Sequence, residues 1–114
     1  MNCLYGITNI VERYGITFDG ILDEIVSLLP TSWQYPEITC ARIILENKEY
    51  KTVNFLETKW KQSADIIIHE EIIGEVDIWY LEEKPESDEG PFLKEERDLL
   101  VAITERLGRI TERF

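Results

Sequence analysis

Histidine, cysteine and basic residues are scarce in this sequence. Its 114 residues include one His and two Cys, and 12 Lys and Arg stand against 23 Asp and Glu, which gives a formal net charge of −11. Binding to nucleic acid or to an anionic lipid surface relies on clusters of Lys and Arg. We therefore expect neither nucleic acid nor a membrane surface as a partner.

Long apolar runs are missing as well. No stretch approaches the roughly 20 apolar residues that span a bilayer. The segment MNCLYGITNIVERYG at the start carries charges inside an apolar pattern and has no basic leader. Cys3 and Cys40 fall on different expected elements, so they make no disulfide framework. These absences favour a reduced compartment, and we expect a cytoplasmic location.

The sequence also lacks the patterns that usually identify an enzyme. It contains no Gly-rich phosphate loop and no Ser/His/Asp arrangement, and the acidic run 82–89 does not have the spacing of a calcium loop. His69 stands beside two glutamates, but a zinc site needs about three protein ligands. We therefore expect a non-enzymatic protein without metal or cofactor. A small metal- or thiol-dependent enzyme that uses His69 and Cys40 is the third of three hypotheses.

What the sequence does contain is one domain with two early helices, four strands and a long final helix. Apolar residues at three- and four-residue intervals, with Thr17 as an N-cap and Pro30 as a stop, indicate the helices. Runs rich in β-branched residues between polar turns indicate the strands. Within the single domain 1–114, the expected helices are 2–14, 17–29 and 92–113, and the expected strands are 38–45, 49–55, 64–70 and 74–82.

Helices at the ends and strands in the centre are typical of an α+β fold with an antiparallel sheet. Alternation along 74–82 sends Val76, Ile78 and Tyr80 to one face, and Asp77 and Trp79 to the other. We expect the N-terminal and C-terminal helices to pack together on the first, aliphatic face. The second face carries polar groups and can remain partly wet.

The second half of the chain resembles the closing half of a GAF-type sensory domain. The resemblance lies in IIIHEEIIGEVDIWYL, EGPFLKEERDLL and AITERLGRITER, where an apolar strand, a turn, an Ile-Gly start to the next strand, an acidic loop and a helix follow in order. With YPEITCARIIL and KWKQSADI, the chain looks like a small GAF-like module of prokaryotic sensor histidine kinases and multi-domain signalling proteins. The resemblance implies a GAF-like fold and a sensory or regulatory role, coupled to an output domain such as a histidine kinase.

One departure from the family narrows what this module could bind. Ligand-binding GAF domains place a long helical lid between their middle strands, and only 56–63 occupies that interval here. About eight residues are too few to enclose a cyclic nucleotide or a tetrapyrrole. The resemblance therefore implies a partner or an unidentified small ligand instead of these two ligand classes.

A shallow pocket on the polar sheet face is the expected ligand site. Trp60 and Trp79 would line it, Arg42 would offer a guanidinium fork to a carboxylate or phosphate, and His69 is a further candidate. The alternative for Arg42 is an ion pair with an acidic residue on a neighbouring strand. A concave polar face favours ligand sensing, whereas a filled face favours the second hypothesis, a dimerisation module without a ligand.

Two apolar seams predict a homodimer through the terminal helices. Apolar residues of the last helix follow alternating four- and three-residue steps, as in a coiled coil, and the first helix carries a similar narrow stripe. The expected seam consists of Leu4, Ile7, Val11, Tyr14, Leu100, Ile103, Leu107 and Ile110. The alternative is that the whole stripe of the last helix packs on its own sheet.

Overall fold

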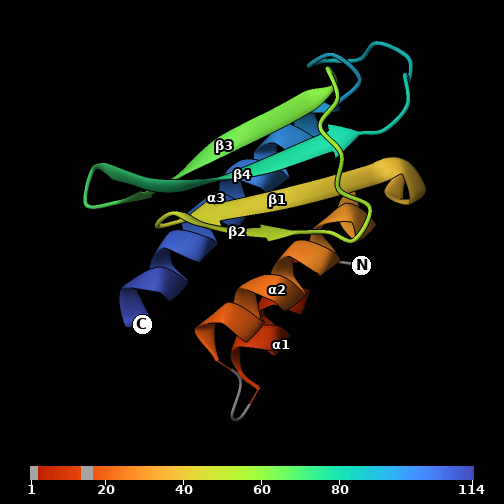
Figure 1. Ribbon diagram of the computed structural model, residues 1–114. Helices are drawn as coiled ribbons and strands as arrows, with labels where there is room; N and C mark the ends of the chain where they lie inside the picture. Colours follow the sequence, from red (N-terminus) through yellow and green to blue (C-terminus); the bar gives the residue numbers. More distant parts are fainter. Residues whose placement is uncertain (1–2, 14–16) are drawn as a thin grey trace.

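The computed structural model describes residues 3–13 and 17–114. Its elements are α1 (Cys3–Val11), α2 (Phe18–Leu28), β1 (Thr39–Leu45), β2 (Lys48–Lys51), β3 (Lys61–Ile68), β4 (Glu71–Tyr80) and α3 (Lys94–Arg113), with 3₁₀ helices at Leu29–Ser32 and Pro36–Ile38. The four strands form one open antiparallel sheet in the order β2-β1-β4-β3 (Figure 1). The α+β prediction is therefore confirmed. Among the described helices, none is both long and apolar enough to cross a membrane.

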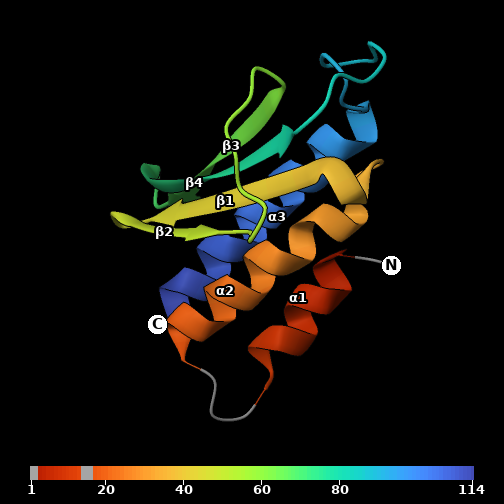
Figure 2. The same ribbon diagram turned by 45° about the vertical axis from the view of Figure 1, so that its right-hand side comes forward.

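All three helices lie on one side of the sheet (Figure 2). The side chains that face them are the apolar set that alternation predicts: Val76, Ile78 and Tyr80 of β4 are buried, and so are Ala41 and Ile43 of β1. These residues join the helices in one hydrophobic core. The opposite side of the sheet, called the outer face below, carries no helix in the described part of the chain.

The apolar stripe of α3 packs on the sheet of its own chain. Leu100, Ile103, Leu107 and Ile110 are all buried members of the core. Because the 20 residues of α3 lie along the back of the sheet, the stripe meets strands over most of its length. Of the two arrangements that the sequence leaves open, the structure has this one, and these four side chains retain no surface for a second chain.

The expected seam residues of the first helix are also directed inward. Ile7 is buried, and Leu4 and Val11 are half-buried and pack against the core. Tyr14 lies outside the described residues. Ile7 therefore offers no surface to a second chain, and Leu4 and Val11 offer only part of theirs.

Both hairpins turn on two residues that have positive φ and are not glycine. The φ angles are 50° at Glu46 and 73° at Asn47 between β1 and β2, and 51° at His69 and 68° at Glu70 between β3 and β4. Two successive left-handed residues form a type I′ turn, whose twist matches that of the strands. The expected strands 64–70 and 74–82 place the second turn between them, next to Gly74. The chain instead turns at residues 69 and 70, and Gly74 lies inside β4.

Gly74 is required by the close approach of a neighbouring strand. A Cβ atom at Gly74 would lie 2.1 Å from the carbonyl oxygen of Ile44 on β1. Gly74 pairs with Leu45 on one side and with Ile66 on the other. Glycine at this position therefore marks a backbone contact inside the sheet, as glycines within strands often do.

The chain leaves the sheet edge earlier than the sequence predicts. Strand β2 ends at Lys51, and Thr52 binds β1 twice: its backbone N–H donates to the Ala41 carbonyl at 3.0 Å, and its hydroxyl accepts from the Ala41 N–H at 3.0 Å. Residues 52–60, called the crossing segment, then pass over the outer face to the far edge (Figure 1). Strand β3 accordingly begins at Lys61, before the expected residue 64.

A buried carboxylate anchors the start of α3. Glu96 accepts hydrogen bonds from the backbone N–H groups of Leu93 at 2.8 Å and Gln34 at 2.7 Å, and from the Tyr80 hydroxyl at 3.3 Å. Burial raises the pKa of Tyr80, and the neighbouring Glu96 carboxylate raises it further. Glu96, the polar residue that interrupts the apolar stripe, thus joins α3 to β4 and to the loop before β1.

Candidate functional site on the outer face

The outer face is a regular grid of side chains in rows that run across the strands. Alternation selects the side chains, and the pairing register aligns them. The tryptophan row is Cys40, Trp79 and Lys61; the arginine row is Lys51, Arg42, Asp77 and Ser63; the acidic row is Glu49, Ile44, Glu75 and Asp65. The polar face that the sequence predicts is thus an ordered array of charges around one large aromatic ring.

Arg42 and Asp77 form a buried ion pair at the centre of the grid. The Arg42 Nε and Nη2 atoms donate to Asp77 Oδ2 at 3.0 and 2.9 Å. The Ser63 hydroxyl donates to Asp77 Oδ1, and Lys61 Nζ lies 3.9 Å from the same oxygen. The side chains of Arg42 and Asp77 are 14% and 0% exposed. The guanidinium fork is therefore occupied by a strand neighbour, which is the alternative that the sequence leaves open for Arg42.

Cations and aromatic rings meet beside this ion pair. The Arg42 guanidinium carbon lies 5.0 Å from the centre of the Trp79 ring, and Lys61 Nζ lies 5.2 Å from it. Phe55 contacts Trp79 edge-to-face with a centroid separation of 5.1 Å. Such contacts hold the buried Trp79 ring in place.

The crossing segment covers the tryptophan row. The Cys40 thiol donates to the Leu56 carbonyl at 3.4 Å, and the Thr58 hydroxyl donates to the Tyr80 carbonyl at 2.7 Å. Burial raises the pKa of the Cys40 thiol, which disfavours the reactive thiolate. This end of the outer face is filled by the chain's own residues, whereas the acidic row lies at the end away from these contacts.

The acidic row holds a carboxyl group with a perturbed pKa. The hydrogen bond that Glu75 shares with Asp77 raises the pKa of Glu75 to about 6, with further contributions from burial and from the Asp77 charge. Asp65 is the direct cross-strand partner of Glu75. Like charges placed opposite one another on adjacent strands destabilise a sheet.

The raised pKa of Glu75 should be visible in the pH dependence of protein stability. This pKa is about 6 in the folded protein and 4.5 in the absence of structure. The folded state therefore holds the extra proton between these values, and the contribution of Glu75 to the free energy of unfolding falls as pH rises through that window. Glu75→Gln should gain stability relative to the parent protein from pH 4 to pH 7.5, as measured by urea unfolding. Glu75→Ala should give the same pH trend with a different offset, and a difference independent of pH would contradict the expectation.

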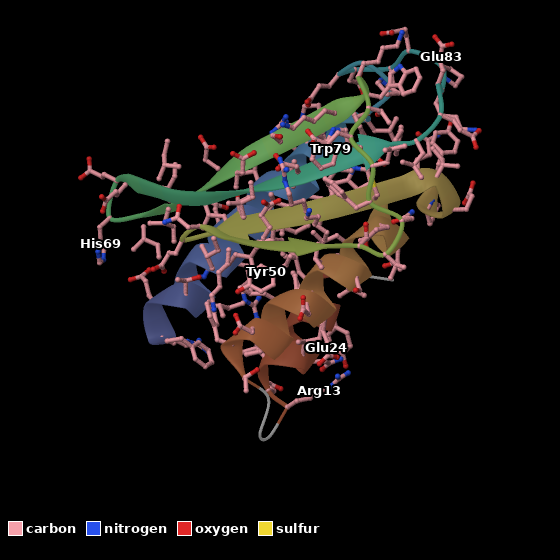
Figure 3. The ribbon with its side chains drawn as sticks, viewed as in Figure 1. Arg13, Glu24, Tyr50, His69, Trp79 and Glu83 are labelled. Carbon is pink, nitrogen blue, oxygen red and sulfur yellow. The ribbon has the colours of Figure 1, made fainter. Side chains whose placement is uncertain are left out.

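The structure brings together two of the four predicted pocket residues. Arg42 and Trp79 are in contact, whereas Trp60 is half-buried against the core, and its carbonyl accepts from the Tyr80 N–H. His69 lies at the β3–β4 turn, far from Trp79 (Figure 3). Its side chain is 84% exposed, and its Nε2 atom lies 3.4 Å from Glu112 of α3.

The residues of the enzyme hypothesis are also separated. Cys40 pairs with Trp79 near the covered end of the sheet, whereas His69 occupies the opposite turn. Cys3 is buried in the core, and burial raises its pKa. Within residues 3–13 and 17–114, no three His, Cys, Asp or Glu side chains gather closely enough to hold a metal ion.

A hollow away from the outer face lies between the start of α2, the β1–β2 hairpin and the end of α3. Its volume is about 470 Å³. Tyr50 donates to Asp19 at 2.6 Å on its wall, and Lys48 Nζ lies 3.4 Å from the same carboxylate. Burial and the Asp19 contact raise the pKa of Tyr50 to about 12. Sequence reasoning missed this hollow because residues from three distant segments form it.

In comparisons with known proteins, the chain matches no family model, no curated protein and no solved structure.

Proposed function

We propose that this chain is a non-enzymatic, GAF-like regulatory domain of a cytoplasmic signal-transduction protein. Its working surface is the outer face, which couples a partner or a small ligand to an output domain such as a histidine kinase. The observation that carries the proposal is the central ion pair of Arg42 and Asp77, held by hydrogen bonds on a sheet face that no described helix covers. The order of strand, turn, strand, acidic loop and helix supports the GAF-like assignment.

A chain of hydrogen bonds leads from this ion pair to the long helix. The Ser63 hydroxyl binds Asp77, and the Ser63 carbonyl accepts from Arg97 Nη1 of α3 at 2.8 Å. Arg97 also binds Glu89 of the acidic loop, with Nε–Oε1 and Nη2–Oε2 distances of 2.9 and 2.6 Å. A displacement of Asp77 or Ser63 would therefore alter the contacts that position α3. A contiguous network of this kind is one physical route by which binding at one surface biases another element.

The experiment is a fusion in which α3 continues as an unbroken helix into the dimerisation helix of a histidine kinase. Lys61→Glu and Glu75→Gln change the outer face, and Glu105→Gln changes an exposed residue of α3 as the matched control. We expect the outer-face variants to change autophosphorylation by about fivefold or more, the low end of common allosteric couplings. Rates equal to those of the parent fusion and of the control would overturn the proposal.

A ligand-free dimerisation module is the second candidate function. The crossing segment favours it, because Phe55 and Leu56 already occupy the tryptophan row with residues of the same chain. In that case the outer face would contact protein instead of a small molecule.

A further inference from the structure

The charges of the outer face are segregated by row. The tryptophan and arginine rows hold the three cations Lys51, Arg42 and Lys61 with a single acid, Asp77. The acidic row holds three carboxylates and no cation. Neighbouring rows are two residues apart, about 7 Å along a strand. The face therefore has a positive end and a negative end within roughly 14 Å.

The negative end is incompletely neutralised inside the chain. Glu49 lies 3.6 Å from Arg42 and 3.8 Å from Lys51. In the part of the chain that the structure describes, Asp65 and Glu75 form no ion pair. These two residues are direct partners on neighbouring strands of the acidic row, so a cation supplied from outside would find two carboxylates beside one another.

We propose that two copies of this chain associate face to face through their outer faces, about a two-fold axis that lies in the interface and runs parallel to the rows, so that the acidic row of each copy lies against the Lys51 and Lys61 side chains of the other. A two-fold axis exchanges the ends of the face, and an isologous interface needs a self-complementary patch of this kind. Both lysines have a long contact with a carboxylate of their own chain, Lys51 with Glu49 and Lys61 with Asp77, yet their side chains remain 45% and 41% exposed and can contact a second copy. This inference rests on the proposed function, because it uses the same outer face. It names a second copy of this chain as the partner.

The uneven height of the outer face also fits the proposed two-fold dimer. The crossing segment raises the positive end, where Leu56 is 60% exposed. This segment contacts the sheet at the tryptophan row, through Phe55 on Trp79 and Leu56 on Cys40, and at the next residue of β4, through Thr58 on Tyr80. Exchange of the ends therefore sets the raised part of one copy beyond the acidic row of the other, and the exposed Leu56 side chain becomes covered.

The size of the face limits the strength of the dimer. Four strands and three rows span roughly 20 by 20 Å, or about 400 Å² per copy. A stable interface typically buries about 800 Å² per partner. Each copy also carries a formal net charge of −11, which opposes association. We therefore expect a weak dimer with a dissociation constant on the order of 100 μM.

The test is a charge exchange followed by sedimentation velocity at about 0.15 M salt, where screening limits repulsion to a range of about 8 Å. One variant carries Lys51→Glu and Lys61→Glu, and the other carries Asp65→Lys and Glu75→Lys. Each alone places like charges in contact, and we expect its self-association to weaken at least about tenfold. An equimolar mixture should restore dimers, because opposite charges then meet at both ends of the interface.

The matched control is the pair Lys94→Glu and Glu105→Lys, which alters exposed charges on α3 and should leave the parent dimer unchanged. A parent protein that stays monomeric up to about 500 μM, or a mixture that fails to associate, would overturn the dimer. If the kinase fusion still responds to outer-face changes in either event, only this inference fails. Loss of that response with intact charge-dependent dimers would instead reject the regulatory role.

Discussion

Gly74→Ala should lower the free energy of unfolding by about 3 kcal/mol, near the upper end of the usual cost of overpacking. The added methyl group would lie 2.1 Å from the Ile44 carbonyl oxygen. Strand β1 cannot yield without disturbing its pairing with β2, so the cost falls on the centre of the sheet. Urea unfolding followed by circular dichroism measures the change, and the slope with denaturant should stay that of the parent protein.

Gly90→Ala provides the control for this prediction. Gly90 has a φ angle of 55°, and a Cβ atom there would meet nothing within 4 Å. The cost is then only that of a left-handed alanine, about 1–2 kcal/mol. A loss at Gly74 smaller than the loss at Gly90 would contradict the steric explanation.

Asp77→Ala should destabilise the protein by about 3–5 kcal/mol, the usual cost of removing one partner from a buried ion pair. The change deprives the Arg42 guanidinium of both hydrogen bonds to Oδ2 and leaves it the weaker carboxylate contact with Glu49 at 3.6 Å and its position over the Trp79 ring. It also removes the acceptor of the Ser63 hydroxyl. The same unfolding measurement at pH 7 gives the size of the effect.

Two further variants separate the ion pair from general surface charge. Arg42→Met combined with Asp77→Leu removes both charges, and its stability should recover most of the loss, because no unpaired charge remains buried. Asp98→Ala breaks the exposed ion pair with Lys94 on α3 and should cost less than about 1 kcal/mol. A double variant no more stable than Asp77→Ala alone would count against the assigned role of the pair.

The architecture was predictable because the apolar residues recur every three or four positions in the helices and every second position in the strands. The period of two in β4 places Val76 and Asp77 on opposite faces, and the structure has them there. The position of the β3–β4 turn was harder to predict from the sequence. Glycine usually marks a turn, but here His69 and Glu70 adopt left-handed angles. Histidine is among the residue types that adopt such angles more often than others, whereas glutamate is not.

The final helix illustrates a different limit. Steps of four and three residues, such as those from Ile103 to Leu107 and Ile110, suit a coiled coil and a sheet surface equally. The sequence contains the stripe but not the surface that covers it. In the structure, α3 lies along the strands, and its stripe is covered by the sheet of the same chain.

The candidate site was predictable in part. Alternation places Arg42 and Trp79 on the polar face, and an ion pair of Arg42 with a strand neighbour was one of two stated alternatives. Trp60 precedes the expected start of β3, so alternation did not apply to it. The segregation of charges by row depends on register, which long-range strand pairing decides.

The position of α3 also has a consequence for aggregation. Strand β3 is an edge of the sheet, and an unprotected edge can recruit strands from other molecules into fibrils. Arg97 binds the Ser63 carbonyl of that edge, and the backbone at Gly108 lies so near the Ile67 carbonyl that a Cβ atom would be 3.1 Å from it. The opposite edge, β2, is only four residues long. Both edges are thus poor templates for a further strand, and we expect the protein to stay free of amyloid at the concentrations that a test of the proposed dimer requires.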